Sequence, residues 1–221
     1  MSKIWPVYEV TGNNYKHYSK NIMMRVFIAI EIANDGIIDL IKKFQNETKI
    51  DAKPVESRNF HFTLQFIGEI SEEMSQKISQ SLQKIEFSEF EVILEGVGTF
   101  PKPKFPRVVW IGTDKHGGNM LIQLSEKVKK ALQPLGFSLD KPFKPHITVF
   151  RIKKKIGDIS KELENKKMIN FGIQKVSGIK LKKSELTSNG PIYSDLMEIL
   201  SLIHISEPTR RRLESRLGCY G

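Results

Sequence analysis

The sequence predicts an α+β fold of two related lobes, in which two antiparallel sheets face a central cleft and helices lie on the outside. Segments rich in β-branched and aromatic residues alternate with segments of helical periodicity. The order strand, helix, strand, helix, strand occurs twice between residues 24 and 200. A His-x-Thr motif stands at the second strand of each repeat, as His61 and Thr63 and again as His146 and Thr148. Such duplication is typical of a pseudo-symmetric architecture.

Each element of the first repeat follows from its local pattern. Strands are predicted where β-branched and aromatic residues dominate. Helices are predicted where apolar residues recur every three or four positions behind a capping residue, here Asn34 and Ser71. In chain order the elements are a strand over 25–32, a helix over 34–48, a strand over 61–67, a helix over 71–85 and a strand over 90–95.

The strand over 61–67 carries the first motif. Its residues alternate with a period of two, which predicts that His61, Thr63, Gln65 and Ile67 share one face. Gly68 is expected to end this strand. The motif therefore places an imidazole and a hydroxyl side by side.

The second repeat follows a loop rich in glycine and proline over 96–106. Leucines and valines at helical spacing predict an amphipathic helix in this half. The predicted elements are a strand over 108–112, a helix over 118–135, a strand over 147–152, a short helix near 157–166, and closing strands over 171–173, 176–181 and 192–199.

The two ends differ from the region between them. Residues 1–23 are polar and aperiodic, and Met24 directly precedes a strand, so we expect 1–23 to be a non-native or disordered extension. Residues 201–210 resemble translated sequencing-adapter read-through, and we expect 201–221 to be an artefactual or disordered tail. The alternative is a genuine basic tail. The folded domain is expected to span 24–200.

Charge and composition fit a globular protein with anionic partners. The net charge is +10, and residues 24–200 retain +6, with 28 Lys and Arg against 22 Asp and Glu. Basic charge favours nucleic acid, although solvated lysines alone give the same balance. Cys219 is the sole cysteine, which excludes an internal disulfide and fits the cytoplasm. No apolar run is long enough to span a membrane, and no signal peptide is evident.

Two facing His-x-Thr motifs suit the opening of a cyclic phosphodiester. One imidazole can activate water and the other can protonate the leaving sugar oxygen, because histidine titrates near neutral pH. The hydroxyls of Thr63 and Thr148 can donate hydrogen bonds to the charged transition state. A lone histidine on a strand is more often structural than catalytic. Two motifs at matching places in a duplicated pattern favour the catalytic interpretation.

Arg151 is the candidate cation for the phosphate. It follows His146 by five residues, so strict alternation places it on the opposite face of the strand. A bulge near Phe150 is required if Arg151 is to reach the phosphate. The alternative is that Arg151 is only a surface charge.

The aromatic residues around the motifs favour a structural role. Phe60 and Phe143 are expected to lie in the core rather than to stack on bases, and Trp110 and Phe100 are also assigned to the core. Tyr193 is expected to pack against the sheet.

Other kinds of site fit the sequence poorly. It contains no Walker-type or Gly-x-Gly-x-x-Gly phosphate loop and no His-Glu-x-x-His motif. Two histidines without a carboxylate or thiolate partner make a poor zinc site. We expect no metal requirement and no cofactor.

Five blocks of sequence, in order, resemble the two-histidine phosphoesterases. Within this group the chain is similar to the RNA 2′,3′-cyclic phosphodiesterases that were first called 2′-5′ RNA ligases. Each block alone is short, but together they cover almost all of 24–198. The blocks are Met24–Glu31, Asn59–Gly68, Gly98–Pro101 with Pro106–Trp110, Pro142–Arg151, and Ser184–Leu186 with Gly190–Tyr193.

The resemblance implies an activity and roles for individual residues. It implies hydrolysis of an RNA 2′,3′-cyclic phosphate to a 2′-phosphate. His61 would donate a proton to the 3′ oxygen, and His146 would activate water. Thr63, Thr148 and, in some members, Arg151 would hold the phosphate. The reverse reaction would join tRNA half-molecules through a 2′-5′ linkage. Independently of the resemblance, we expect a cytoplasmic monomer that acts without a membrane.

Two alternatives stay open at this stage. The chain can be an RNA-end binding module with an inactive site, although intact His and Thr in both motifs oppose this. It can also act on a small cyclic nucleotide, such as an ADP-ribose cyclic phosphate, rather than on RNA.

Overall fold

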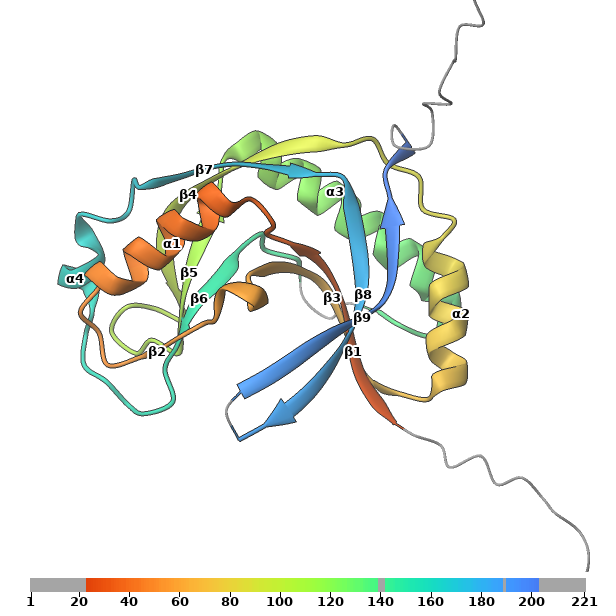
Figure 1. Ribbon diagram of the computed structural model, residues 1–221, viewed down its shortest axis with the longest axis horizontal. Helices are drawn as coiled ribbons and strands as arrows, with labels where there is room; N and C mark the ends of the chain where they lie inside the picture. Colours follow the sequence, from red (N-terminus) through yellow and green to blue (C-terminus); the bar gives the residue numbers. More distant parts are fainter. Residues whose placement is uncertain (1–22, 139–141, 189, 203–221) are drawn as a thin grey trace, which may run out of the picture.

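The computed structural model describes residues 23–138, 142–188 and 190–202 (Figure 1). The ends predicted to be foreign therefore lie almost entirely outside the described residues, as do His17, His204 and Cys219. In chain order the elements are β1 (Met24–Glu31), α1 (Asp35–Glu47), β2 (Lys53–Pro54), the 3-10 helix η1 (Ser57–Asn59), β3 (His61–Ile70), α2 (Glu72–Leu82), β4 (Phe90–Phe100), β5 (Val108–Thr113), α3 (Lys115–Leu132), the 3-10 helix η2 (Gln133–Leu135), β6 (Ile147–Arg151), α4 (Ser160–Glu164), β7 (Asn170–Val176), β8 (Gly178–Thr187) and β9 (Gly190–Leu200).

The duplicated order of elements is confirmed. The first repeat is β1–α1–β3–α2–β4, and the second is β5–α3–β6–α4–β7. The predicted caps are also present, since the side chain of Asn34 accepts a hydrogen bond from the Ile37 amide at the start of α1. Ser71 does the same at the start of α2, where it accepts from Met74.

Several predicted boundaries were wrong. β4 continues to Phe100 instead of ending at residue 95, because Gly96, with a φ of +73°, forms a bulge in the pairing with β5 that lets the strand go on into the predicted loop. α3 begins earlier than expected, at Lys115, because the Asp114 carboxylate accepts from the Gly117 amide and caps the helix there. β3 does not end at Gly68 but continues to Ile70. Gly68 adopts a φ of +94°, which lets the strand pass through an irregularity in its pairing with β1.

The strands form one continuous antiparallel sheet. Its strand order is β7-β4-β5-β6-β3-β1-β8-β9, and β2 pairs with β6. The prediction of two sheets is not confirmed, because these strands form a single sheet with two halves. We call β3-β1-β8-β9 the first lobe and β6-β5-β4-β7 the second lobe. The sheets are not separate, because β3 pairs with β6 between the lobes through Phe62 and Ile147.

The two repeats exchange elements between the lobes. β4 of the first repeat pairs with β5 in the second lobe, and β8, which follows the second repeat, pairs with β1 in the first lobe. The helix α1 packs against β6 and β7, whereas α3 packs against β3 and β4. Each lobe is therefore built from both halves of the chain.

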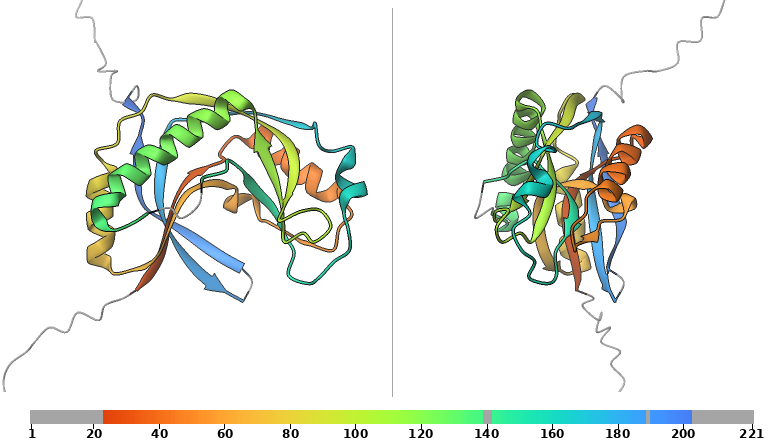
Figure 2. Two further views of the ribbon diagram at one scale, coloured as in Figure 1. Left: turned by 180° about the vertical axis from the view of Figure 1, so that it is seen from behind. Right: turned by 90° about the vertical axis from the view of Figure 1, so that its left-hand side faces the viewer.

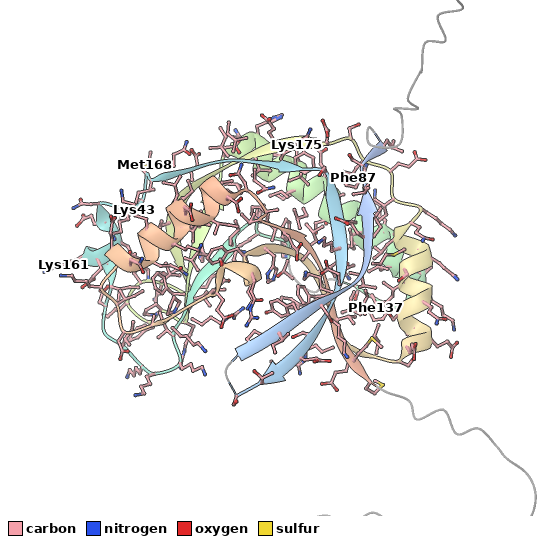
Figure 3. The ribbon with its side chains drawn as sticks, in the orientation of Figure 1. Lys43, Phe87, Phe137, Lys161, Met168 and Lys175 are labelled. Atoms are coloured by element: carbon pink, nitrogen blue, oxygen red, sulfur yellow. The ribbon has the colours of Figure 1, made fainter. Side chains whose placement is uncertain are left out.

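Helices cover the strands on two sides. Figure 2 shows α1 and α3 on opposite sides of the strands, as expected for helices on the outside. Between them lies one apolar core, in which Phe62, Leu64, Ile111 and Ile147 are almost fully buried. Polar side chains such as those of Lys43 and Lys161 point outward from this core (Figure 3). The core fixes both motif strands rigidly at the junction of the lobes.

Candidate active site

A cavity of about 300 Å³ lies where the two lobes meet. All five residues predicted to form the site line it, namely His61, Thr63, His146, Thr148 and Arg151. The four motif residues are half-buried, because each points away from the core-facing residue beside it on its strand. The structure thus brings together residues that lie 85 positions apart in the chain.

Strand register arranges the two motifs as a pair. β3 and β6 are antiparallel and Phe62 pairs with Ile147. In that register His61 lies across from Thr148, and Thr63 lies across from His146. Residues opposite each other on neighbouring strands have Cβ atoms about 5 Å apart. Each imidazole is therefore next to one hydroxyl on its own strand and one on the facing strand.

A bulge in β6 turns Arg151 toward the cavity. Val109 pairs with Phe150 and Trp110 pairs with Thr148, so one residue of β6 is left over between them. Val149 and Phe150 consequently both face the core, at 0% and 3% exposure. The extra residue returns Arg151 to the same side as Thr148, which confirms the bulge that the sequence required.

An equivalent bulge occurs in β3. Thr63 pairs with Ala29 and Gln65 with Ile28, so Leu64 is the extra residue and both it and Gln65 are buried. The prediction that Gln65 and Ile67 share a face with the first histidine was therefore wrong. The residue that returns to the cavity is Phe66, which is 71% exposed and lines the site. Phe66 occupies the place that Arg151 has in the second motif.

Both histidines are anchored in the same way. The Nδ1 atom of His61 lies 2.7 Å from the Asn59 carbonyl oxygen, and that of His146 lies 2.6 Å from the Lys144 carbonyl oxygen. A carbonyl oxygen only accepts, so Nδ1–H is the donor in each case. This leaves both Nε2 atoms available to exchange protons with a ligand in the cavity.

Aromatic rings hold each imidazole in place. His61 lies 5.1 Å from the Phe27 ring and 5.4 Å edge-on to the Tyr193 ring, measured between centroids. His146 lies 5.1 Å from Phe100 and 6.4 Å from Trp110. Such contacts restrict ring orientation, as proton transfer requires.

Burial controls the protonation of the two imidazoles. Desolvation lowers the pKa of His61 to about 4. The hydrogen bond to the Asn59 carbonyl raises this pKa, but by less, and the positive charge of nearby Lys182 lowers it further. Desolvation also lowers the pKa of His146. Both rings are therefore neutral at pH 7 in the free protein. An anionic ligand between them would raise both pKa values.

Four charged side chains form a cluster behind His61. Lys180 and Lys182 of β8 each bind both Glu31 of β1 and Asp195 of β9. Burial raises the pKa of Glu31, but hydrogen bonds from the two ammonium groups outweigh this and lower it. Because Lys182 is almost fully buried, this cluster fixes the strands that carry Tyr193 and Phe27.

Several residues of the site escaped the sequence interpretation. Tyr193 lines the cavity, where burial raises the pKa of its hydroxyl and a hydrogen bond from Arg151 opposes the rise. Its place in the matched block Gly190–Tyr193 was the signal that could have identified it. The assignment of Phe100 and Trp110 to the core was wrong, since both are only partly buried and pack on His146 instead.

A second groove adjoins the cavity on the side of His146. Its volume is about 750 Å³, and Thr63, Phe66 and His146 line both spaces. Phe143 lies in this groove and is partly buried, whereas Phe60 is in the core, as predicted.

Two features are absent from the described ranges. No three His, Cys, Asp or Glu side chains there are grouped as they would be to hold a metal ion. No helix in the same ranges combines the length and apolar character needed to cross a membrane.

Comparison with a protein family gives a match over most of the chain. Residues 25–199 match the model of the AKAP7 2′5′ RNA ligase-like domain. This range contains both motifs and every element from β1 to β9, apart from one residue at each end.

Curated relatives share one name. The chain is 40% identical over 175 residues to an RNA 2′,3′-cyclic phosphodiesterase of Archaeoglobus fulgidus, which covers 78% of this chain and 98% of that protein. It is 41% identical over 155 residues to the protein of the same name from Aeropyrum pernix, covering 69% of this chain and 88% of that protein.

Solved structures share the fold. A Thermus thermophilus protein matches with a TM-score of 0.66 at 28% identity, over 80% of this chain and 97% of its own. E. coli LigT complexed with 3′-AMP also matches with a TM-score of 0.66, at 25% identity, over 81% of this chain and 99% of its own.

Proposed function

Because this chain belongs to the 2′5′ RNA ligase-like family, we propose that it hydrolyses RNA 2′,3′-cyclic phosphates to 2′-phosphates, with His61 and His146 as the acid and base. The relatives' shared name supports the reaction class. The observation that carries the chemistry is the pair of imidazoles lining one cavity, each anchored through Nδ1.

The proposed step needs two proton transfers, one from the attacking water to a base and one from an acid to the leaving oxygen. His146 Nε2 takes a proton from water as the water oxygen bonds to phosphorus. The bond from phosphorus to O3′ breaks, and His61 Nε2 gives its proton to that oxygen. His61 is neutral in the free protein, so it takes up this proton when the anionic phosphate binds beside it.

Three side chains are placed to hold the phosphate. The hydroxyls of Thr63 and Thr148 line the cavity between the imidazoles, and the Arg151 guanidinium approaches from the second lobe. Hydrogen bonds from such donors stabilise the extra negative charge of the transition state. These groups and the histidines account for the reaction without a metal ion, and we propose that none is required.

The test uses an oligoribonucleotide ending in a 2′,3′-cyclic phosphate, with a chelator present. We expect the wild-type protein to release the 2′-phosphate product. His61→Ala and His146→Ala should each lower kcat by about 10²–10⁴-fold. His116→Ala is the matched control, because His116 is exposed on α3 and lies outside the cavity, and it should retain full activity. No product from the wild type, or full activity in both active-site variants, would contradict the proposal.

We also propose that the same site catalyses the reverse reaction, in which two RNA ends are joined through a 2′-5′ linkage. The groove of about 750 Å³ beside His146 supports this, because it offers room for a nucleoside where water would otherwise attack. tRNA half-molecules are the proposed substrates. Adding a 5′-hydroxyl oligonucleotide to the assay above should give a 2′-5′ joined product. If no joined product forms at high oligonucleotide concentration, the ligation proposal fails and only the hydrolysis proposal stands.

A further inference from the structure

Two loops beside the cavity form a strongly basic edge of the second lobe. The loop between β4 and β5 and the loop between β6 and α4 lie side by side (Figure 2). Backbone hydrogen bonds join them, from Ile152 to Arg107 and from Ile159 to Pro103. We call this surface the basic rim and define it by Lys102, Lys104, Arg107, Lys153, Lys154 and Lys155.

The charge of the basic rim is largely uncompensated. Lys102 and Lys153–Lys155 are exposed, and among the described residues no member of the rim forms an ion pair. Asp158, the acidic residue that follows, is occupied by hydrogen bonds from Ser160, with Lys104 near enough to lower its pKa further.

The basic rim differs from the rest of the surface in gathering six cations on two adjoining loops, whereas several lysines elsewhere stand beside a carboxylate. On α1, Lys42 and Lys43 pair with Asp39 and Glu47. On α2, Lys77 pairs with Glu73. Repulsion among unpaired cations is relieved when a polyanion binds, so this edge favours an anionic partner.

The basic rim is continuous with the site. Arg151 and Lys153 line the catalytic cavity, and Arg107 lines the adjoining groove. The opposite edge, formed by the β8–β9 hairpin, presents apolar Leu186 and Ile192, which are 70% and 45% exposed. A chain of phosphates leaving the cavity therefore meets uncompensated positive charge on one side and apolar surface on the other.

An exposed aromatic ring lies within the basic rim. Phe105 is 50% exposed, and the Lys104 ammonium lies 5.9 Å from the centre of its ring. Cations that follow a phosphate backbone, combined with aromatic rings on which bases stack, are typical of surfaces that bind single-stranded nucleic acid.

We propose that the basic rim binds the single-stranded RNA upstream of the terminal nucleotide, so that the enzyme acts on oligoribonucleotides in preference to small cyclic nucleotides. This inference rests on the proposed function and names its substrate class. The cyclic end occupies the cavity, the preceding phosphates follow Lys153, Lys154 and Lys155, and a base stacks on Phe105.

The test compares a 2′,3′-cyclic mononucleotide with a ten-nucleotide RNA that ends in the same cyclic phosphate. The rim variant is Lys104→Ala/Lys154→Ala/Lys155→Ala, whose three residues lie outside both the cavity and the groove. Its kcat/KM on the RNA should fall about tenfold, while its kcat/KM on the mononucleotide stays unchanged. Removing three phosphate contacts should also reduce the salt slope of log KM by about 2.

Two control variants separate the rim from general effects of charge and folding. Lys84→Ala/Lys115→Ala/Lys130→Ala removes the same charge from exposed positions away from the rim and should act like the wild type. Lys104→Arg/Lys154→Arg/Lys155→Arg keeps the positive charge of the rim and should retain the wild-type kcat/KM on RNA.

Each outcome has a distinct meaning. Equal kcat/KM of the wild type on both substrates, or an equal loss in the rim and control variants, would overturn this inference. If the wild type hydrolyses neither substrate, the proposed function itself fails instead.

Discussion

At the scale of the residue, the position of His61 on a half-buried strand face determines its charge. The ring is enclosed by Phe27 and Tyr193, and the lost hydration lowers its pKa to about 4. In the proposed mechanism, the proton that His61 donates is therefore taken up from solvent when the phosphate binds and is absent from the ring of the free protein. Phosphate binding should accordingly be accompanied by proton uptake.

The depressed pKa of His61 predicts a pH-dependent stability. The unfolded histidine titrates near 6.5, so on acidification the unfolded chain takes up its proton first and unfolding is favoured. This stability is present above about pH 6.5 and is lost as the pH falls toward 4. In urea unfolding, His61→Gln should reduce the difference in unfolding free energy between pH 7 and pH 5 by about 2 kcal/mol.

Exposed His116 supplies the control for this experiment, since His116→Gln should leave the difference unchanged. The pH range of this comparison lies above the range in which Glu31 and Asp195 titrate, because the pKa of each is lowered from the usual carboxyl value. An identical pH dependence in the wild type and His61→Gln would contradict the assignment.

At the scale of the element, matched bulges in β3 and β6 shape the site. The sequence indicated that a bulge was needed for Arg151, because five residues separate it from His146. The matching bulge at Leu64 was not predicted, because an alternating pattern with a buried Gln65 looks like an uninterrupted strand. Sequence periodicity therefore locates a strand but not the point at which its faces switch.

β4 and β5 support the second histidine through one close contact. A Cβ atom on Gly98 would lie 2.2 Å from the indole of Trp110, which packs on Phe100 and His146. Gly98→Ala should therefore displace the indole, destabilise the protein by about 1–3 kcal/mol, and lower kcat on a cyclic mononucleotide. Thermal unfolding and kinetics measure the two effects.

Gly157→Ala is the matched control for this substitution, because nothing lies within 4 Å of a Cβ atom there and its φ is not positive. It should change neither stability nor kcat. Wild-type stability and kinetics in Gly98→Ala would show that the indole does not support His146.

At the scale of the whole molecule, the exchange of strands and helices ties the lobes into one unit. The first repeat supplies β4 and α1 to the second lobe, and the chain returns with β8 and β9 to complete the first. α3 packs against β3 of the first lobe and β4 of the second, so the unfolding of either lobe removes packing from the other. The unfolding of this domain should therefore be cooperative.

Hydrogen exchange in increasing urea tests this cooperativity. Peptides covering β1 and β5, the strands that pair on both sides within each lobe, should lose protection at the same urea concentration. β9, which is paired only with β8 among the described strands, should exchange earlier and serves as the internal control. Separate transitions for β1 and β5 would mean that the lobes unfold independently.

The sequence predicted the order of elements and the five site residues, because periodicity and motif spacing are local properties. It did not predict which lobe receives β4 or β8, since strand pairing depends on tertiary packing rather than on the pattern of one strand. Tyr193 was assigned to packing for the same reason. Its contact with His61 depends on β9 pairing with β8, and β8 with β1.

The single pair of Phe62 and Ile147 has a mechanical consequence for the two histidines beside it. If the lobes pivot about their narrow junction, displacement grows with distance from the pivot. Groups far from this pair would then move farther than His61 and His146, which flank it in the sequence. A small change in the angle between the lobes would therefore leave the spacing of the two imidazoles nearly unchanged.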